Sequence, residues 1–271
     1  MYGAILGDVA GSIYEFDAKT HRIQDLTEHI KHSATVFTDD TVMTVAIADA
    51  LMHAGDNADD STIQQRAVIN MRYWGTEYSG VGYGYMFNEW LYSENPKPYG
   101  SYGNGAAMRI SPVGWMYDSL EKTLHVAELV TAVTHDNKGA VDGAKAVSAA
   151  IFLARNGHSK QEIREYIERT FHYELDKSIV DLVNPMQKNI KCRTAVIQSL
   201  IAFFESESLD DAISKAIFIG GDTDTLACIT GSIAEAYYGY IQNAALKSIL
   251  LDKLPENIKR IADEFESKYY S

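Results

Sequence analysis

Two short clusters of threonine and aspartate, each followed by an apolar run, constrain the fold of this chain more than any other feature. The first is Thr38-Asp39-Asp40-Thr41, ahead of residues 42–52, and the second is Asp222-Thr223-Asp224-Thr225, ahead of residues 226–238. Each apolar run reads as a buried helix, so each cluster lies at the positive end of a helix dipole. Threonine and aspartate are also ordinary N-cap residues, and capping would explain either cluster alone.

Capping does not explain the two clusters together, because a helix start uses one side chain and each cluster supplies four polar ones. Surplus carboxylates beside buried helices cost free energy unless a cation balances them. The clusters offer only oxygen ligands, which suit hard divalent cations such as Mg²⁺ or Mn²⁺. Because 182 positions separate Asp40 from Asp222, such a site would be assembled across the whole fold.

Residues 3–16 predict a helix that packs closely against another backbone. Gly3, Gly7 and Gly11 recur every four residues and give this helix a smooth face. Each glycine costs a helix about 1 kcal/mol relative to alanine, so close packing is expected to explain them. Glu15 follows at the end of the run, either as a solvated terminal acid or as a carboxylate delivered into a crowded interior.

Helical patterns dominate the remainder of the chain, and no alternating strands, clean repeat or linker divides it. Capping boxes are expected at Ser61 with Gln64 and at Ser159 with Glu162. We therefore expect one all-α domain over residues 1–271. The stretch 75–105 is the longest without clear helical periodicity, apart from a short helix near 86–92. It ends in Gly100-Ser101-Tyr102-Gly103-Asn104-Gly105, which reads either as a phosphate-holding nest of backbone N–H groups or as a plain surface turn.

Charge and cysteine usage exclude several classes of protein. The formal net charge is −13 and the pI is about 5.0, which makes nonspecific binding to nucleic acid or to anionic membranes unfavourable. Cys192 and Cys228 form no C-x-x-C pair, which excludes a zinc ribbon or thioredoxin motif and fits a reducing cytoplasm. Cys228 is expected in the core. Neither a signal peptide nor a membrane span is expected.

Five motifs together resemble the ADP-ribosylglycohydrolase family. They are Gly-Asp-Val-Ala-Gly-Ser-Ile-Tyr-Glu at 7–15, Thr-Asp-Asp-Thr at 38–41, Gly-Asn-Gly-Ala-Ala-Met-Arg at 103–109, Thr-His at 134–135 and Gly-Gly-Asp-Thr-Asp-Thr at 220–225. Each motif is modest alone, but the five stand in the family's order over nearly the whole chain. The resemblance implies a single compact multi-helix domain with a centre of two divalent cations, Mg²⁺ or Mn²⁺.

The resemblance also implies roles for individual residues. Its metal ligands would be Thr38, Asp39, Asp40, Asp222, Asp224 and Thr225. Its catalytic candidates are Glu15, which matches the acidic residue beside the metals, and Asp39 and Asp40. The substrate would be held by Gly100, Ser101, Tyr102, Gly103, Asn104, Gly105 and His135. Without the resemblance, His135 would more simply be a helix-capping or core histidine.

The implied activity is metal-dependent hydrolysis of an N- or O-glycosidic bond at ribose C1 of an ADP-ribosylated protein or a small ADP-ribosyl ester. Arginine-directed members often carry an aspartate in the loop that here spans residues 80–85 and has none. Its absence favours an O-linked substrate, such as ADP-ribosyl-serine, poly-ADP-ribose or O-acetyl-ADP-ribose. Tyr83, Tyr85, Tyr99 and Tyr102 are candidates to stack on adenine.

Two alternatives stay open: a catalytically weak or inactive ADP-ribose-binding member of the same fold, and an unrelated Mg²⁺-dependent phosphatase.

Overall fold

The chain folds into helices joined by loops, and the computed structural model, which describes residues 1–270, contains no β-strand within them. The elements are α1 (Tyr2–Gly11), η1 (Ser12–Tyr14), α2 (Leu26–Ile30), α3 (Asp39–Ala54), α4 (Asp60–Glu77), α5 (Tyr85–Tyr92), α6 (Gly105–Met108), α7 (Ser111–Met116), α8 (Leu120–Ala132), α9 (Lys138–Arg155), α10 (Lys160–Phe171), α11 (Ile179–Leu182), α12 (Cys192–Glu205), α13 (Leu209–Ile219), α14 (Thr223–Tyr238), α15 (Ala244–Asp252) and α16 (Glu256–Tyr269). The prediction of an all-α fold is therefore confirmed.

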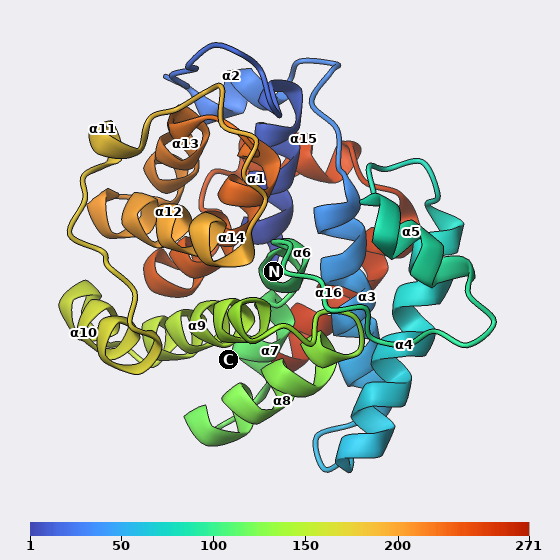
Figure 1. Cartoon of the computed structure of the whole chain (residues 1–271). Coiled ribbons are helices and arrows are strands. Elements are labelled where there is room, and N and C mark those ends of the chain that lie inside the picture. Colours follow the sequence, from blue (N-terminus) through green and yellow to red (C-terminus); the bar gives the residue numbers. More distant parts are fainter. Residues whose placement is uncertain (271) are drawn as a thin grey trace.

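Helix α14 forms the centre of the molecule, and its residues are buried from Thr223 to Ala236 (Figure 1). Helix α1 packs along it, and α12, α13 and α9 also contact it. The glycines of α1 explain how closely the two backbones approach. A Cβ atom added at Gly7 would lie 2.0 Å from the carbonyl oxygen of Ala227, and one added at Gly3 would lie 2.4 Å from that of Gly231. The predicted close packing of this helix is confirmed.

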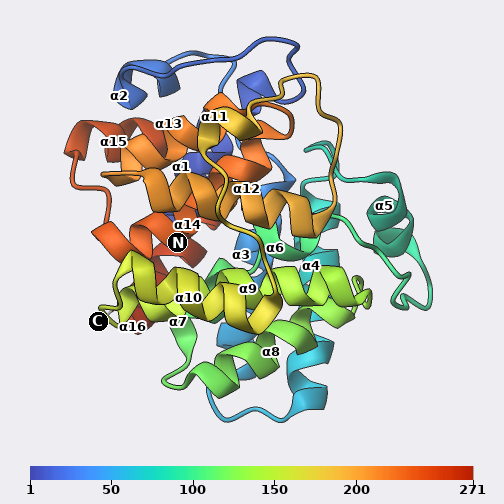
Figure 2. The same ribbon diagram turned by 60° about the vertical axis from the view of Figure 1, so that its left-hand side comes forward.

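The other helices surround this centre on different sides. In Figure 1, α3 and α4 lie to the right with α5 outside them, α12 and α13 lie to the left, and α8, α9 and α10 lie below. The turned view keeps α8, α9 and α10 beneath α12 (Figure 2). Helices α3 and α14 both contact the short helix α6. Both aspartate-rich helix starts are therefore brought to one region of the fold.

Local capping chemistry sets several of the helix starts. Ser159 and Glu162 form the predicted capping box of α10. The capping box predicted at Ser61 is wrong, because α4 begins at Asp60 and the Asp59 carboxylate accepts a hydrogen bond from the Thr62 N–H over 2.7 Å. A carboxylate at a helix N-terminus gains from the helix dipole as well as from the hydrogen bond, so Asp59 caps this helix in place of Ser61.

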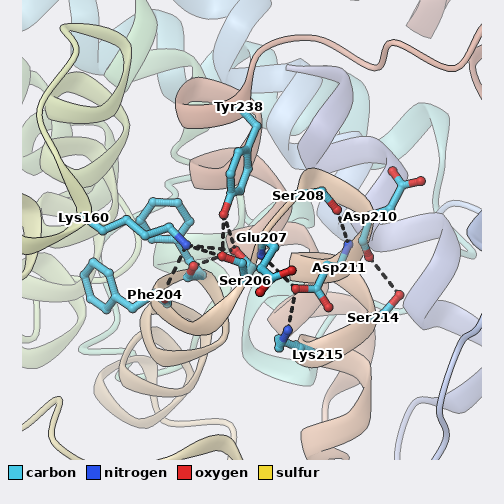
Figure 3. Close-up of polar contacts among 11 residues, drawn as sticks. Lys160, Phe204, Ser206, Glu207, Ser208, Asp210, Asp211, Ser214, Lys215 and Tyr238 are labelled. Atoms are coloured by element: carbon cyan, nitrogen blue, oxygen red, sulfur yellow. Dashed lines mark hydrogen bonds and ion pairs between the residues drawn. The ribbon is translucent and has the colours of Figure 1, made fainter.

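A lysine from α10 closes the end of α12 (Figure 3). Lys160 Nζ donates hydrogen bonds to the carbonyl oxygens of Phe204, at 3.2 Å, and Ser206, which are acceptors that a helix end leaves without partners. The Tyr238 hydroxyl, from the end of α14, donates to the same Ser206 carbonyl over 2.6 Å. Burial, together with the nearby charge of Lys215, lowers the pKa of Lys160 to about 8. These contacts join α10, α12 and α14.

Two further expectations concern apolar segments and cysteines. Within residues 1–270, none of the helices has the length and apolar character needed to span a membrane. Cys192 and Cys228 are both buried and free. Cys228 lies inside α14, among the buried residues of that helix, as expected for a small core side chain.

Candidate active site

A pocket of about 420 Å³ brings the two aspartate clusters together. It lies where the start of α3, the start of α14, the loop after η1 and the loop before α6 meet. It is lined by every predicted site residue except Thr38, namely Glu15, Asp39, Asp40, Gly100, Ser101, Tyr102, Gly103, Asn104, Gly105, His135, Asp222, Asp224 and Thr225. The packing of α1, α3 and α6 against α14 thus gathers residues from both ends of the chain.

Five carboxylates form two overlapping groups in this region. Oxygen atoms of Asp8, Asp40 and Asp224 lie within 4.8 Å of one another, as do oxygen atoms of Glu15, Asp222 and Asp224. Asp224 therefore belongs to both groups. Asp39 belongs to neither group, but it lines the same pocket.

The donor set fits hard divalent cations. Asp40 is buried, its Oδ2 accepts a hydrogen bond from Thr225 Oγ1 over 3.1 Å, and its Oδ1 has no hydrogen-bond partner in the described part of the chain. A buried carboxylate oxygen without a partner is costly unless a cation is bound to it. The surrounding donors are carboxylate and hydroxyl oxygens, which are the ligands that Mg²⁺ and Mn²⁺ prefer.

Burial and mutual repulsion raise the pKa values of Asp39, Asp40 and Asp224. The pKa of Asp39 rises to about 8, first through burial and then through the charge of Asp8. Burial also raises the pKa of Asp40 and of Asp224 well above the ordinary value, and neighbouring aspartates raise both further. The cluster can stay fully ionised at neutral pH only when positive charge is supplied to it.

Asp8 is a member of this cluster that sequence reasoning did not select. It is fully buried in α1, and its oxygens accept hydrogen bonds from the N–H of Thr38 at 2.9 Å, the N–H of Thr41 at 3.0 Å and both threonine hydroxyls. Asp8 thereby fixes the first turn of α3, which carries Asp39 and Asp40. One clue was available in the sequence, because a carboxylate among glycines and apolar residues of a buried helix needs polar partners.

Thr38 has a structural role at the start of α3. Its hydroxyl donates to Asp8 Oδ1 over 2.7 Å and accepts from the N–H of Asp40 over 3.3 Å. The second contact is an N-cap, as one of the two sequence interpretations expected. Thr38 is the one predicted site residue that does not line the pocket.

Glu15 lies at the mouth of the pocket and follows η1 directly. The residue is exposed, so it is not delivered into a crowded interior, yet its carboxylate lies beside Asp222 and Asp224. The N–H of the next residue, Phe16, donates to the carbonyl oxygen of Gly221 over 2.6 Å and holds this segment against the second cluster. Although the residue as a whole is exposed, partial desolvation of its carboxyl group at the pocket mouth raises the pKa of Glu15, and the charges of Asp222 and Asp8 raise it further.

The glycine-rich loop at 100–105 forms another part of the pocket wall. Its ends are fixed, because the N–H of Gly100 donates to Asp136 Oδ1 over 2.7 Å and the N–H of Asn104 donates to the Ile190 carbonyl over 2.9 Å. Within residues 1–270, three N–H groups of this loop donate no hydrogen bond: those of Ser101, Tyr102 and Gly105. Backbone N–H groups of this kind can bind an anion.

His135 is buried behind this loop. A Cβ atom added at Gly105 would lie 3.4 Å from His135 Nε2, so this ring nitrogen lies beside the loop. Burial, followed by the charge of Arg109, lowers the pKa of His135 well below its ordinary value. The imidazole is therefore neutral at physiological pH.

The four tyrosines proposed as adenine partners divide into two sets. Tyr85, Tyr99 and Tyr102 line the pocket. Tyr85 and Tyr102 are 78% and 58% exposed, which leaves their rings free to contact a ligand. Tyr83 instead packs on Phe87, with ring centroids 5.4 Å apart, and does not line the pocket.

Comparison with known proteins gives consistent matches over the whole chain. A model of the family described as ADP-ribosylglycohydrolase matches residues 1–270. The human protein named ADP-ribosylhydrolase ARH3 is 27% identical over an alignment that covers 97% of this chain and 88% of that protein. ADP-ribosylarginine hydrolase Tri1 of Pseudomonas putida (strain GB-1) is 25% identical over 261 residues, covering 88% of this chain and 69% of that protein. A solved structure titled ADP-ribosylglycohydrolase-related protein complex aligns with a TM-score of 0.65 at 20% identity, covering 98% of this chain and 93% of that one.

Proposed function

Because the chain belongs to the ADP-ribosylglycohydrolase family, we propose that it is a metal-dependent hydrolase that releases ADP-ribose by cleaving the glycosidic bond at ribose C1. Its substrates would be ADP-ribosylated proteins or small ADP-ribosyl esters. One observation carries the proposal. The two carboxylate groups that share Asp224 and the loop at 100–105 line one pocket, so a ligand with a ribose at one end and a diphosphate farther along can contact both.

Two divalent cations, Mg²⁺ or Mn²⁺, would be held by Asp39, Asp40, Asp222, Asp224 and Thr225. Thr38 would join these ligands only when its hydroxyl turns away from Asp8, to which it donates over 2.7 Å. The unpartnered Oδ1 of Asp40 and the raised pKa values of Asp40 and Asp224 support this ligand set. When bound, such cations orient the ribose hydroxyls and lower the pKa of a bound water.

Glu15 is the candidate for proton transfer. Glycosidic cleavage at C1 builds positive, oxocarbenium-like charge on the ribose, and a carboxylate at the pocket mouth can stabilise that charge. Glu15 can also accept a proton from the attacking water or deliver one to the leaving group. Its raised pKa, caused by burial and by Asp222 and Asp8, brings it closer to the range in which it can exchange protons. Asp39, which has a pKa of about 8 before a cation binds, lines the same pocket as Glu15.

The loop at 100–105 would hold the diphosphate, with the free N–H groups of Ser101, Tyr102 and Gly105 as donors. Tyr102 and Tyr85 would contact the adenine at the rim, where both side chains are exposed. Binding energy from this remote half of the ligand would position C1 at the carboxylates.

The linkage we propose is O-glycosidic. Gly82, from the loop at 80–85, lies against Asp39, because a Cβ atom added there would be 3.2 Å from Asp39 Oδ1. The loop therefore borders the reacting end of the pocket and contributes no carboxylate to it. A guanidinium leaving group would gain no acidic partner from this loop, whereas a serine, ribose or acetyl oxygen requires none.

The alternative is a member of the fold that binds ADP-ribose without cleaving it. Loss of activity would be expected to follow loss of a metal-binding aspartate, yet Asp39, Asp40, Asp222 and Asp224 all line the pocket. We therefore favour the enzyme.

Two variants test the assignment of roles. Glu15→Gln retains the size of the side chain and removes its basicity, so ADP-ribose affinity by calorimetry should change little while turnover falls by about 10²–10⁴. Asp222→Asn should weaken cation binding and, with it, both ligand affinity and turnover. Full activity of Glu15→Gln would remove Glu15 from the mechanism.

A substrate panel tests the linkage. Peptides ADP-ribosylated on serine or arginine, poly-ADP-ribose and O-acetyl-ADP-ribose are incubated with the protein and Mg²⁺ or Mn²⁺, and released ADP-ribose is measured. We expect release from at least one O-linked substrate and none from ADP-ribosyl-arginine. Release from the arginine peptide alone would contradict the proposed linkage. Tight ADP-ribose binding without release from any substrate would favour the binding protein.

A further inference from the structure

Arg109 is the one lysine or arginine that lines the pocket among the described residues, and it is 1% exposed. Its Nη2 donates a hydrogen bond to Thr134 Oγ1 over 2.6 Å, while its Nε has no partner. Burial lowers the pKa of Arg109 only to about 10, so the guanidinium is charged at neutral pH. A fixed positive charge without a carboxylate partner therefore lies behind a pocket whose other charged groups are acidic.

The same contacts determine which ring nitrogen of His135 carries a proton. Nδ1 lies 2.7 Å from Thr134 Oγ1 and 3.5 Å from Arg109 Nη2. A guanidinium can only donate, and the Thr134 hydroxyl, which accepts from Arg109, has its own proton free to donate. Its other acceptor, the Thr131 carbonyl, is more distant at 3.4 Å. The Thr134 hydroxyl could accept from an Nδ1–H, but Arg109 Nη2 could not, and an Nδ1–H would face the Nη2 hydrogen atoms. The contact with Arg109 therefore favours Nδ1 as the acceptor.

We propose that Arg109 and Thr134 are positioning residues that hold neutral His135 in the tautomer protonated on Nε2, so that this N–H donates a hydrogen bond to the anionic group bound by the loop at 100–105. Nε2 is the ring atom that faces the loop, since Cβ atoms added at Gly105 and Gly103 would lie 3.4 and 3.8 Å from it.

This arrangement gives a function to a buried arginine that has no carboxylate partner in the described part of the chain. A free carboxylate next to Arg109 would neutralise it and would also repel a phosphate. We call the hydrogen-bonded series Arg109–Thr134–His135 the relay. It leaves the guanidinium charge without a carboxylate partner until an anion binds. It also makes His135 Nε2–H a hydrogen-bond donor toward that anion. The identity of the anion as the diphosphate of ADP-ribose rests on the proposed function, whereas the tautomer of His135 does not.

Nitrogen NMR of the ligand-free protein tests the tautomer directly. With ring nitrogens labelled with ¹⁵N, the shifts and proton couplings of His135 distinguish Nε2–H, Nδ1–H and the doubly protonated ring. We expect Nε2–H at neutral pH, and we expect this proton to shift when pyrophosphate or ADP-ribose is added but not when adenosine is added. An Nδ1–H ring, a doubly protonated ring, or an Nε2–H unaffected by both phosphate ligands would overturn the proposal.

Three threonine variants separate the relay from general packing. Thr134→Val removes the hydroxyl at nearly constant volume, so it should yield a mixture of tautomers and weaken ADP-ribose binding about tenfold, as expected for one hydrogen bond to a charged group. Thr134→Ser should restore both properties. Thr131→Val is the matched control, because Thr131 lies in the last turn of α8, just before Thr134, is equally buried, and has a hydroxyl without a hydrogen-bond partner in the described part of the chain.

The two proposals can fail separately. If pyrophosphate shifts the Nε2–H resonance while no ADP-ribosyl substrate is cleaved, the hydrolase proposal is wrong and the relay stands. If the substrate is cleaved while His135 carries its proton on Nδ1, the relay is wrong and the hydrolase stands. Mn²⁺ affinity should be the same in Thr134→Val and in the unmodified protein, which shows that the carboxylate cluster is intact. If Thr134→Val lost Mn²⁺ affinity by the same factor as ADP-ribose affinity, Thr134 would have a merely structural role.

Discussion

The side-chain amide of Asn104 donates a hydrogen bond to Asp222 Oδ2 over 2.7 Å. Asn104 belongs to the glycine-rich loop, and Asp222 precedes α14 and belongs to the carboxylate cluster. One hydrogen bond therefore joins the wall that would hold the diphosphate to the wall that would hold the cations. It also fixes the orientation of the Asp222 carboxylate, whose remaining lone pairs can bind a cation.

Asn104→Ala should weaken cation binding although Asn104 is not a proposed ligand. Removing a group that orients a metal ligand typically costs about 10- to 100-fold in metal affinity, so we expect the Kd for Mn²⁺ to rise by about tenfold or more in calorimetry. Asn88→Ala provides the control, because Asn88 is exposed on α5 and lies outside this pocket. Unchanged Mn²⁺ affinity in Asn104→Ala would show that this contact does not position Asp222.

The metal-free protein should lose stability as pH rises through neutrality. The pKa of Asp39 is about 8 in the folded protein against 3.8 for the free side chain, and the pKa values of Asp40 and Asp224 are raised as well. The folded state then binds more protons than the unfolded state between these values, so the free energy of unfolding falls as pH rises from about 4 to about 8.

Saturating Mg²⁺ should remove most of this pH dependence, because a bound cation keeps the carboxylates ionised at both ends of the window. Urea unfolding at several pH values, with Mg²⁺ and with chelator, measures the difference. A metal-free protein that is more stable at pH 8 than at pH 5 would contradict the assigned pKa directions.

Gly7→Ala should destabilise the fold strongly. The added Cβ would lie 2.0 Å from the Ala227 carbonyl oxygen, so α1 would have to move away from α14 and carry Asp8 with it. We expect a loss of at least about 3 kcal/mol, at the upper end of the range for overpacked cores. Gly80→Ala is the control, since no atom lies within 4 Å of a Cβ added there. Equal denaturant midpoints for the two variants would contradict the close approach of α1 and α14.

The sequence was most informative where a residue type has a single physical explanation. Gly3, Gly7 and Gly11 weaken a helix unless another backbone contacts them, and the contact with α14 is present. The two Thr/Asp clusters supplied more carboxylates than capping uses, and both clusters line one pocket. In both cases the residues would destabilise the fold on their own, so their presence indicated the contact that offsets the free-energy cost.

The other features of the site could not be predicted, because they depend on contacts between residues that are far apart in the sequence. Asp8 reads as one polar residue in a small-residue helix, and its contact with Thr38 and Thr41 becomes visible only when α1 lies beside α3. Glu15 remained ambiguous because its position depends on the contact between Phe16 and Gly221. Arg109 stood inside a recognised motif without a role, since its lack of a carboxylate partner is a property of the folded interior.

A titration of the metal-free protein with Mn²⁺, with bound Mn²⁺ and released ADP-ribose measured in the same samples, tests the central claim most directly. The claim is that one pocket built from two distant aspartate clusters hydrolyses an O-linked ADP-ribosyl substrate with two bound cations. We predict two Mn²⁺ ions bound per chain, no release without metal, and a rate that rises with occupancy of the pair. An undiminished rate in excess chelator, or full Mn²⁺ binding and full activity in Asp222→Asn, would contradict the account.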